Sequence, residues 1–443
     1  MMLGKSALRR AVQFDNSTPC GATLCIAVLC RGIMSGVRTV RRRALVAGIW
    51  LAWILGVAAW TGCDHTPNQF VVNRVFARNQ KLAASVDEFA TAEVSQRLQD
   101  IEQVVTRFFG TPDAPVLPEV DGVDWNSLAE LPLLQLAAGP VNRASGQTTQ
   151  GLYRYHCATC HGISGDGQGP TAAGLNPYPR DYRRGLFKFK RTAATLPPTD
   201  EDLRTIIARG VPGTRMPSFS QLSDRERSAL VQYVRYLSIR GLFERALITE
   251  VMLELDPEER LLSQELKQIS PTLYADQEAW IDEILQKVVA PWIAERNTVV
   301  SVPPAPADFG SRQSISRGRE MFFTTLTNCG KCHGDTAMGD GQTDDYDEWT
   351  KELEPTVPDA LADYLALGAL PPRKVQPRIL RDGIYRGGPQ PEDLFLRIKH
   401  GITGTTMPAV AAQLSDDDIW HLVDFVRYLP TDLKREEKAE RRK

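Results

Sequence analysis

Cysteine and histidine occur twice in the same arrangement in this chain. Residues 157–161 read Cys-Ala-Thr-Cys-His, and residues 329–333 read Cys-Gly-Lys-Cys-His. Two thiols at this spacing can bond the vinyl groups of a porphyrin, and the histidine that follows can bind its iron. A zinc half-site or a thiol redox pair uses the same cysteine spacing, but neither requires the adjacent histidine that both copies carry. The pattern therefore predicts two covalently bound haems. The residues concerned are Cys157, Cys160, His161, Cys329, Cys332 and His333.

A longer pattern repeats around the two motifs. Both copies contain the same short blocks in the same order: Gly-Asp-Gly-Gln at 165 and 339, Pro-Arg at 179 and 377, Gly-Thr-x-Met-Pro at 213 and 404, Gln-Leu-Ser-Asp at 221 and 413, and Val-Arg-Tyr-Leu at 234 and 426. Chance does not align so many blocks in order, so the chain contains an internal duplication. Each copy spans about a hundred residues, which is a normal domain size.

One methionine occupies the same position in each copy. Met216 and Met407 both lie in the Gly-Thr-x-Met-Pro block. A thioether is a soft, neutral ligand that favours ferrous iron, and histidine with methionine raises the potential of a haem. A lone methionine commonly fills a core, but the repetition at matched positions favours the ligand. The other possible axial ligands are His156, His400 and His421, and none of them recurs in the other copy.

Each repeat resembles a class I c-type cytochrome domain, and the pair resembles a di-haem cytochrome c. The resemblance covers about residues 142–241 and 311–432. It implies a small all-α domain around each haem c, with iron held between the motif histidine and the downstream methionine. The implied ligand pairs are His161 with Met216 and His333 with Met407.

The resemblance also suggests residues that surround the haems. In the family a proline soon after the motif gives its carbonyl to the ligating histidine, and Pro170 fits that role, whereas Thr343 stands in the second repeat. Arg180 and Arg378 occupy matched positions, and arginine binds carboxylates bidentately. We therefore expect these two arginines to hold haem propionates, although an arginine on a solvated loop is the alternative.

The expected fold class is all-α. A capping box at Ser223 and the start of a counterpart helix at Ser415 predict that each repeat ends in a helix. Helical patterns outside the repeats suggest spacers or docking helices, and an acidic insertion at 344–359 is expected to be a solvated loop. The predicted segments are 1–63, a signal or membrane anchor with a possible mis-assigned start; 64–141, a helical and Pro-rich spacer; 142–241, cytochrome c domain 1; 242–310, a helical linker; 311–432, cytochrome c domain 2; and 433–443, a charged tail.

The amino-terminal segment carries a pattern typical of export. Four arginines in 38–43 precede an uncharged run at 44–62, which as a helix would be about 28 Å long and close to the thickness of a bilayer. A basic flank before an apolar run indicates a signal or an anchor. Residues 60–63 resemble a lipoprotein cleavage box, so the anchor is either this helix or a lipid on Cys63. Either choice places the haem domains on the periplasmic side of a bacterial cytoplasmic membrane, and we expect translation to start at Met34.

The overall net charge of −2 hides a difference between the repeats. Residues 142–241 contain 15 Lys and Arg against 7 Asp and Glu, whereas residues 311–434 contain 14 against 19. Opposite charges suggest either different docking partners or attraction between the repeats. A basic and aromatic stripe and a Gly-rich phosphate loop are both missing from the sequence, so nucleic acid is not an expected partner.

Three functions are compatible with these motifs. The first is a membrane-tethered electron carrier, or a cytochrome subunit of a quinol-oxidising or terminal-oxidase complex, whose partners are redox proteins. The second is an enzyme similar to di-haem cytochrome c peroxidases, which requires one iron with an open site. The third is a haem-based sensor, which would need a signalling domain. Because each repeat has its own Met-Pro loop, the sequence favours the electron carrier.

Overall fold

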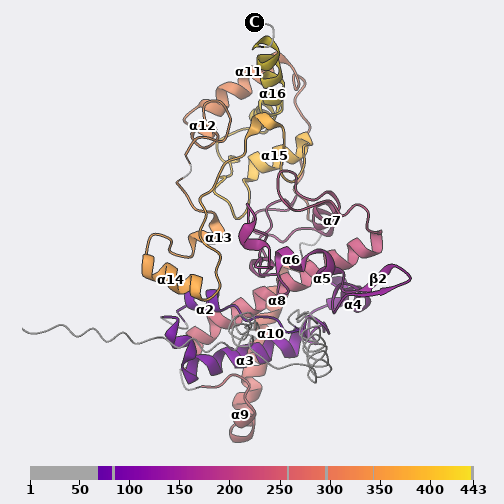
Figure 1. Ribbon diagram of the computed structural model, residues 1–443, viewed down its shortest axis with the longest axis vertical. Coiled ribbons are helices and arrows are strands. Elements are labelled where there is room, and N and C mark those ends of the chain that lie inside the picture. The colour runs from indigo at the N-terminus through magenta and orange to yellow at the C-terminus, as the bar shows by residue number, and fades with distance from the viewer. Residues whose placement is uncertain (1–67, 82–84, 257–258, 295–297, 343, 441–443) are drawn as a thin grey trace, which may run out of the picture. The chain divides into compact units, whose positions relative to one another are not determined.

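The computed structural model describes residues 68–81, 85–256, 259–294, 298–342 and 344–440. The described chain is mostly helical, which confirms the predicted all-α class (Figure 1). Its one hairpin pairs β1 (Asn142–Ala144) with β2 (Gln147–Gln150). Within these described residues, no helix combines the length and apolar character needed to cross a bilayer. The predicted anchor at 44–62, Cys63 and Met34 lie outside the described residues.

The first repeat is built from short helices around its motif. They are α5 (Leu152–His156), α6 (Ala158–His161), α7 (Asp200–Arg209) and α8 (Asp224–Glu254). The predicted capping box at the start of α8 is confirmed, because the Ser223 hydroxyl accepts from the Glu226 N–H while the Glu226 carboxylate accepts from the Ser223 N–H. Short 3-10 turns, η3 (Ala172–Gly174) and η4 (Tyr182–Arg184), shape the loop after the motif.

The second repeat uses equivalent helices around a core of its own. They are α11 (Arg312–Phe323), α12 (Cys329–His333), α15 (Pro391–His400) and α16 (Asp416–Glu440), with the turn η5 (Leu380–Asp382). Phe395 and Trp420 pack with their ring centroids 4.7 Å apart. Gly318 lies where α11 crosses α16, and a Cβ there would be 1.9 Å from the carbonyl oxygen of His421. The two helices therefore approach closely only because this residue is glycine.

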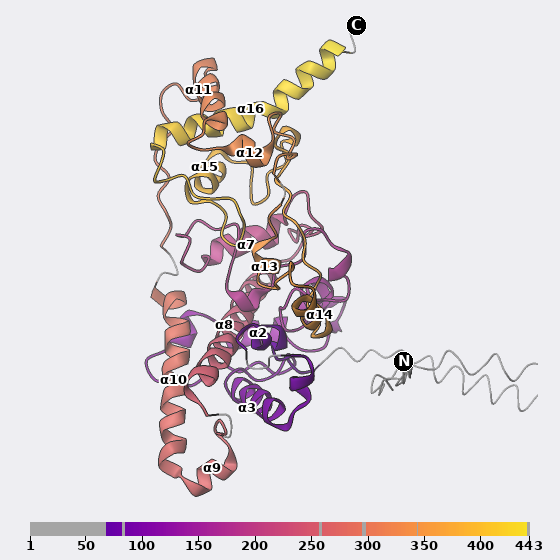
Figure 2. The same ribbon diagram turned by 90° about the vertical axis from the view of Figure 1, so that its left-hand side faces the viewer.

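The segments predicted as spacers pack into one core with the first repeat. They form α2 (Arg74–Asn79), α3 (Ala92–Phe109), α4 (Leu131–Ala137), α9 (Gln264–Ile269) and α10 (Pro271–Ala294), with the turns η1 (Asp87–Ala90) and η2 (Trp125–Ser127). Helix α8 continues past residue 241, where the sequence suggested a domain boundary, and α3 and α10 pack against it (Figures 1 and 2). Phe108 and Phe109 of α3 both contact Phe243 of α8.

The acidic insertion predicted at 344–359 is largely exposed, as expected of a solvated loop, but it contains the short helix α13 (Glu348–Lys351) and the buried Leu353. Helix α14 (Pro358–Ala366) follows it, and Leu353 and Tyr364 are buried in a small core with Val75 of α2. Figures 1 and 2 both show α14 beside α2. We call residues 344–373 the strap. The sequence did not indicate this packing, because the apolar residues of the strap contact partners far away in the chain.

The strap is also tied to the first repeat by polar contacts. Arg373 donates to the carbonyl oxygens of Leu175 and Ala173, and its guanidinium lies 3.8 Å from the ring centroid of Tyr178. Salt bridges join Glu352 to Arg184 at 2.6 Å and Asp347 to Lys188 at 3.6 Å. Part of the charge difference between the two repeats is therefore neutralised by ion pairs between them.

Candidate haem sites

The two Cys-x-x-Cys-His motifs form equivalent single helical turns. In α6 the His161 N–H donates to the Cys157 carbonyl oxygen at 2.8 Å, and in both motifs a glycine follows the histidine at the helix end. Residues three and four apart lie on one face of a helix, so the two sulfurs and the imidazole of each motif share a face. None of these four cysteines takes part in a disulfide. Burial raises the pKa of Cys157 to about 12.

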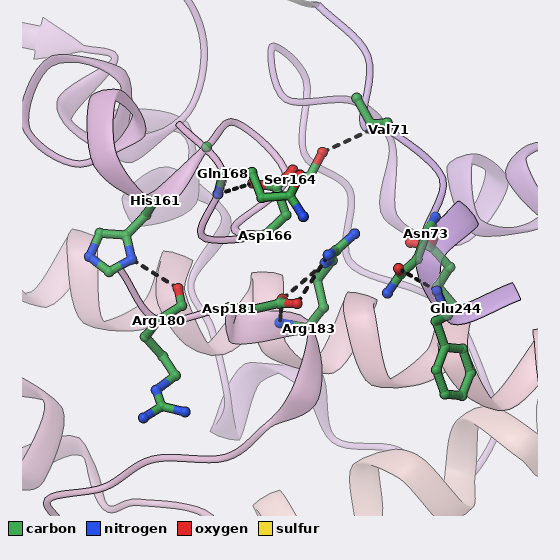
Figure 3. A network of polar contacts seen from close by, with 12 residues as sticks. Val71, Asn73, His161, Ser164, Asp166, Gln168, Arg180, Asp181, Arg183 and Glu244 are labelled. Carbon is green, nitrogen blue, oxygen red and sulfur yellow. Dashed lines mark hydrogen bonds and ion pairs between the residues drawn. The ribbon is translucent and has the colours of Figure 1, made fainter. Parts of the chain in front are cut away.

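Each motif histidine is held by a backbone carbonyl through its Nδ1 atom. His161 Nδ1 lies 3.0 Å from the Arg180 carbonyl oxygen (Figure 3), and His333 Nδ1 lies 3.1 Å from that of Arg378. A carbonyl only accepts, so Nδ1 carries the hydrogen and Nε2 keeps the lone pair that an iron ligand needs. Burial lowers the pKa of His161 to about 4 and lowers that of His333, which keeps both imidazoles neutral.

The predicted partner of His161 requires a correction. Pro170 does not provide the carbonyl that holds the ring; Arg180 does. The N–H groups of Gly169 and Thr171, on either side of the proline, donate to the carbonyl oxygens of Cys160 and Thr159 in α6. In the second repeat the Arg378 carbonyl holds His333 in the same way, although Asp344 stands at the position that aligns with Pro170. The Pro-Arg pair that recurs at 179 and 377 was the sequence signal for these positions.

Tyr182 is a site residue that the sequence did not indicate. Its ring is buried and stacks on the His161 imidazole, with centroids 4.7 Å apart and planes 15° apart. The His161 ring is therefore restrained twice: the Tyr182 ring packs on its face, and the Arg180 carbonyl holds its Nδ1 atom. Tyr182 lies two residues after Arg180, and the matching position after Arg378 is Leu380. Because the tyrosine does not recur, the repeat pattern gave no indication of its role.

The two methionine loops have the same hydrogen bonds. The Val211 N–H donates to the Met216 carbonyl at 3.1 Å, and the Ile402 N–H donates to that of Met407 at 3.2 Å. In each loop a threonine hydroxyl accepts from the methionine N–H, at 3.1 Å from Thr214 and 3.2 Å from Thr405. Both methionine side chains are half-buried. The duplicated sequence therefore folds into duplicated loop geometry.

The other histidines have different surroundings. His156 packs edge-on to the Phe219 ring, with centroids 5.4 Å apart. His421 is buried, and its Nδ1 lies 2.9 Å from the hydroxyl of Ser314, which donates to Asp424. His400 lines a cavity of about 350 Å³ together with Met407. Only the motif histidines, among those the structure describes, are bound to a carbonyl that recurs in both repeats.

The residues present fit haem c. Two sulfurs and an available Nε2 share one helix face in each repeat, and each repeat has a methionine loop of matched geometry. Within the described chain, the buried Nε atoms of Arg378 and Arg386 have no hydrogen-bond partner. Unsatisfied guanidinium N–H groups are costly to bury, and carboxylates such as haem propionates would satisfy them.

Comparison with known proteins agrees with this geometry. Residues 144–234 and 313–426 both match the family model described as cytochrome c oxidase, cbb3-type, subunit III. These two segments, 205 of the 443 residues, support the assignment of the chain as a c-type cytochrome. The two matched segments of the cytochrome coincide with its two repeats, and covalently bound haem c is the cofactor that this class implies.

One solved structure similar to the cytochrome is a reducing HAO-like protein complex from Kuenenia stuttgartiensis. It shares 24% sequence identity, with a TM-score of 0.42, and the match covers 63% of this chain and 93% of that chain. No curated protein matches the cytochrome significantly.

Replacing Gly210 with alanine is expected to displace Met216. Gly210 has φ +68°, and a Cβ there would lie 2.5 Å from the carbonyl carbon of Pro217 and 2.7 Å from the Met216 carbonyl oxygen. The loop must move, so the weak far-red absorption of a ferric haem with a sulfur ligand should fall by about half in the whole protein. Gly174→Ala is the matched control, because nothing lies within 4 Å of its Cβ. Equal far-red absorption in both variants would show that this loop does not hold the ligand.

Proposed function

We propose that this cytochrome carries two covalently attached haems and passes single electrons between redox partners. The observation that supports this most directly is that both repeats hold the same proposed iron ligands with the same hydrogen bonds. Each repeat has a motif histidine bonded to an arginine carbonyl and a methionine loop closed by the same hydrogen bonds. The proposed iron ligands are His161 with Met216 and His333 with Met407.

The proposed coordination suits electron transfer without bond chemistry. Haem supplies a one-electron couple, and the His and Met side chains would fill both axial positions in each repeat. The carbonyls of Arg180 and Arg378 fix the imidazoles, and Tyr182 restrains the plane of His161. A rigid ligand set changes little between the two oxidation states, which favours rapid transfer.

We further propose that the cytochrome is tethered to the bacterial cytoplasmic membrane and faces the periplasm. Support comes from the arginines at 38–43 followed by the uncharged run at 44–62, and from Cys63 as a possible lipid attachment site. The partner would be a respiratory complex, either quinol-oxidising or a terminal oxidase. The description of the matching family, a subunit of a cytochrome c oxidase, supports the second choice.

Carbon monoxide distinguishes this proposal from a peroxidase. Because a methionine would occupy the second axial position of each iron, carbon monoxide added to the dithionite-reduced protein should leave the visible spectrum almost unchanged. A peroxidase needs distal access at one iron and would give a large Soret change in about half of the haem. The Met216→Ala variant serves as a positive control for an opened site. A large change in the unmodified protein would overturn the electron-carrier proposal in favour of the enzyme.

A further inference from the structure

Arg180 and Arg378 each contact both repeats. The carbonyl of Arg180 bonds His161, and Figure 3 shows its guanidinium extending away from that ring. This guanidinium lies against the methionine loop of the other repeat, where a Cβ on Gly404 would be 3.6 Å from Arg180 Nη1. Arg378 mirrors it, because a Cβ on Gly213 would be 2.8 Å from Arg378 Nη2. Each arginine thus connects the histidine of one haem site with the methionine loop of the other.

Further cations gather at the same place. Arg386 donates to the Gly213 carbonyl at 3.4 Å, and burial together with Arg378 lowers the pKa of Arg386 to about 10. Burial and Arg180 lower the pKa of Lys188 to about 8, although the Asp347 carboxylate opposes this. Burial also lowers the pKa of Arg180. Cations from both repeats therefore face each other in a partly desolvated region, where Asp347 and Asp181 are nearby carboxylates.

Such a cluster requires anions. Buried cations repel one another unless carboxylates or phosphates neutralise them, and arginine forks fit carboxylates bidentately. Asp347 of the strap is one carboxylate at this position, 3.6 Å from the Lys188 amine. The Nε atoms of Arg378 and Arg386 remain buried and without a hydrogen-bond partner in the described chain. These donors, together with the guanidiniums of Arg180 and Arg378 that meet between the repeats, could bind carboxylates of a ligand.

We propose that Arg180 and Arg378 form one carboxylate-binding site shared between the repeats, which takes propionates of both haems. Each arginine then acts as a positioning residue that sets the potential of the haem in the opposite repeat as well as its own. This inference rests on the proposed function, since it requires a haem in each repeat. A nearby cation stabilises an added electron, so losing one arginine lowers both potentials.

The test isolates the influence of Arg378 on the haem of the first repeat. In a Met407→His background the second haem titrates at a much lower potential, so the upper wave of a redox titration belongs to the first haem. Arg378→Gln in this background should lower that wave by about 59 mV, equivalent to a tenfold weaker reduction for one electron. Arg378→Lys should restore most of the shift because it keeps the charge. Arg319→Gln, at an exposed position on α11, should cause none.

The reciprocal experiment uses Arg180→Gln in a Met216→His background, and it covers the case in which the Arg378 variant does not fold. The upper wave should again fall, now for the second haem. If each arginine substitution shifts only the lower wave, which belongs to the haem of the same repeat, the proposal of a shared site is wrong. The proposed di-haem function would not be affected by that result. If the unmodified protein carries fewer than two haems, the proposed function itself fails.

Discussion

Replacing Met216 with alanine is expected to lower the midpoint potential of one haem by on the order of 0.1 V, within the roughly 0.8 V range that axial ligands span. The Thr214 hydroxyl and the Val211 N–H hold the loop that presents this side chain. Without the thioether the ferrous state loses its preferred ligand, and the opened iron should bind carbon monoxide. A redox titration and a carbon monoxide difference spectrum measure the two effects.

The control for this substitution is Met252→Ala. Met252 lies in α8 and packs half-buried against the core of the first repeat, so its loss removes a similar side chain without touching the methionine loop. It should leave both potentials unchanged. Equal potentials in the Met216 and Met252 variants would mean that Met216 fills the core and that another group binds the iron.

Replacing Glu244 with alanine is expected to reduce the free energy of unfolding by about 3–5 kcal/mol, because it leaves a buried cation unpaired. Glu244 Oε2 lies 2.9 Å from Arg240 Nη1, and the two side chains are only 1% and 3% exposed. Its other oxygen accepts from the Asn73 N–H at 2.5 Å. The change should therefore also release the segment around α2 from α8. Chemical denaturation followed by far-UV circular dichroism measures the loss.

Glu254→Ala is the matched control for this prediction. Glu254 is the last residue of the same helix and is exposed, so its replacement should change stability by less than about 0.5 kcal/mol. Protease susceptibility near Asn73 should rise in the Glu244 variant alone. Coincident denaturation curves for the two variants would contradict the assignment of this ion pair to the core.

The repeated residues made much of the site predictable. Duplication aligned the two motifs and the two Met-Pro loops, and these four elements have matched local geometry in the structure. The helix start at Ser223 followed from its capping box, which depends on residues only three apart. Local patterns of this kind are visible in a single sequence because all the partners are close together in the chain.

The other features of the site and the fold depend on contacts between residues far apart in the chain, which no local sequence pattern indicates. A backbone carbonyl such as that of Arg180 is present in every residue type, so composition could not select it over Pro170. The core of the strap joins Tyr364 to Val75, nearly three hundred positions apart. Arg180 and Arg378 were expected near propionates of their own repeats, but their contact with the opposite methionine loops depends on how the two repeats pack.

The number of haems bonded to each chain tests the central claim most directly. The full-length protein, with residues 1–63 retained and purified in mild detergent, should give two haems by pyridine haemochrome assay and two iron atoms per polypeptide by elemental analysis. Acid acetone should extract neither haem, because thioether bonds at Cys157, Cys160, Cys329 and Cys332 hold them. Complete extraction into acid acetone, or one iron atom or fewer per chain, would contradict the account.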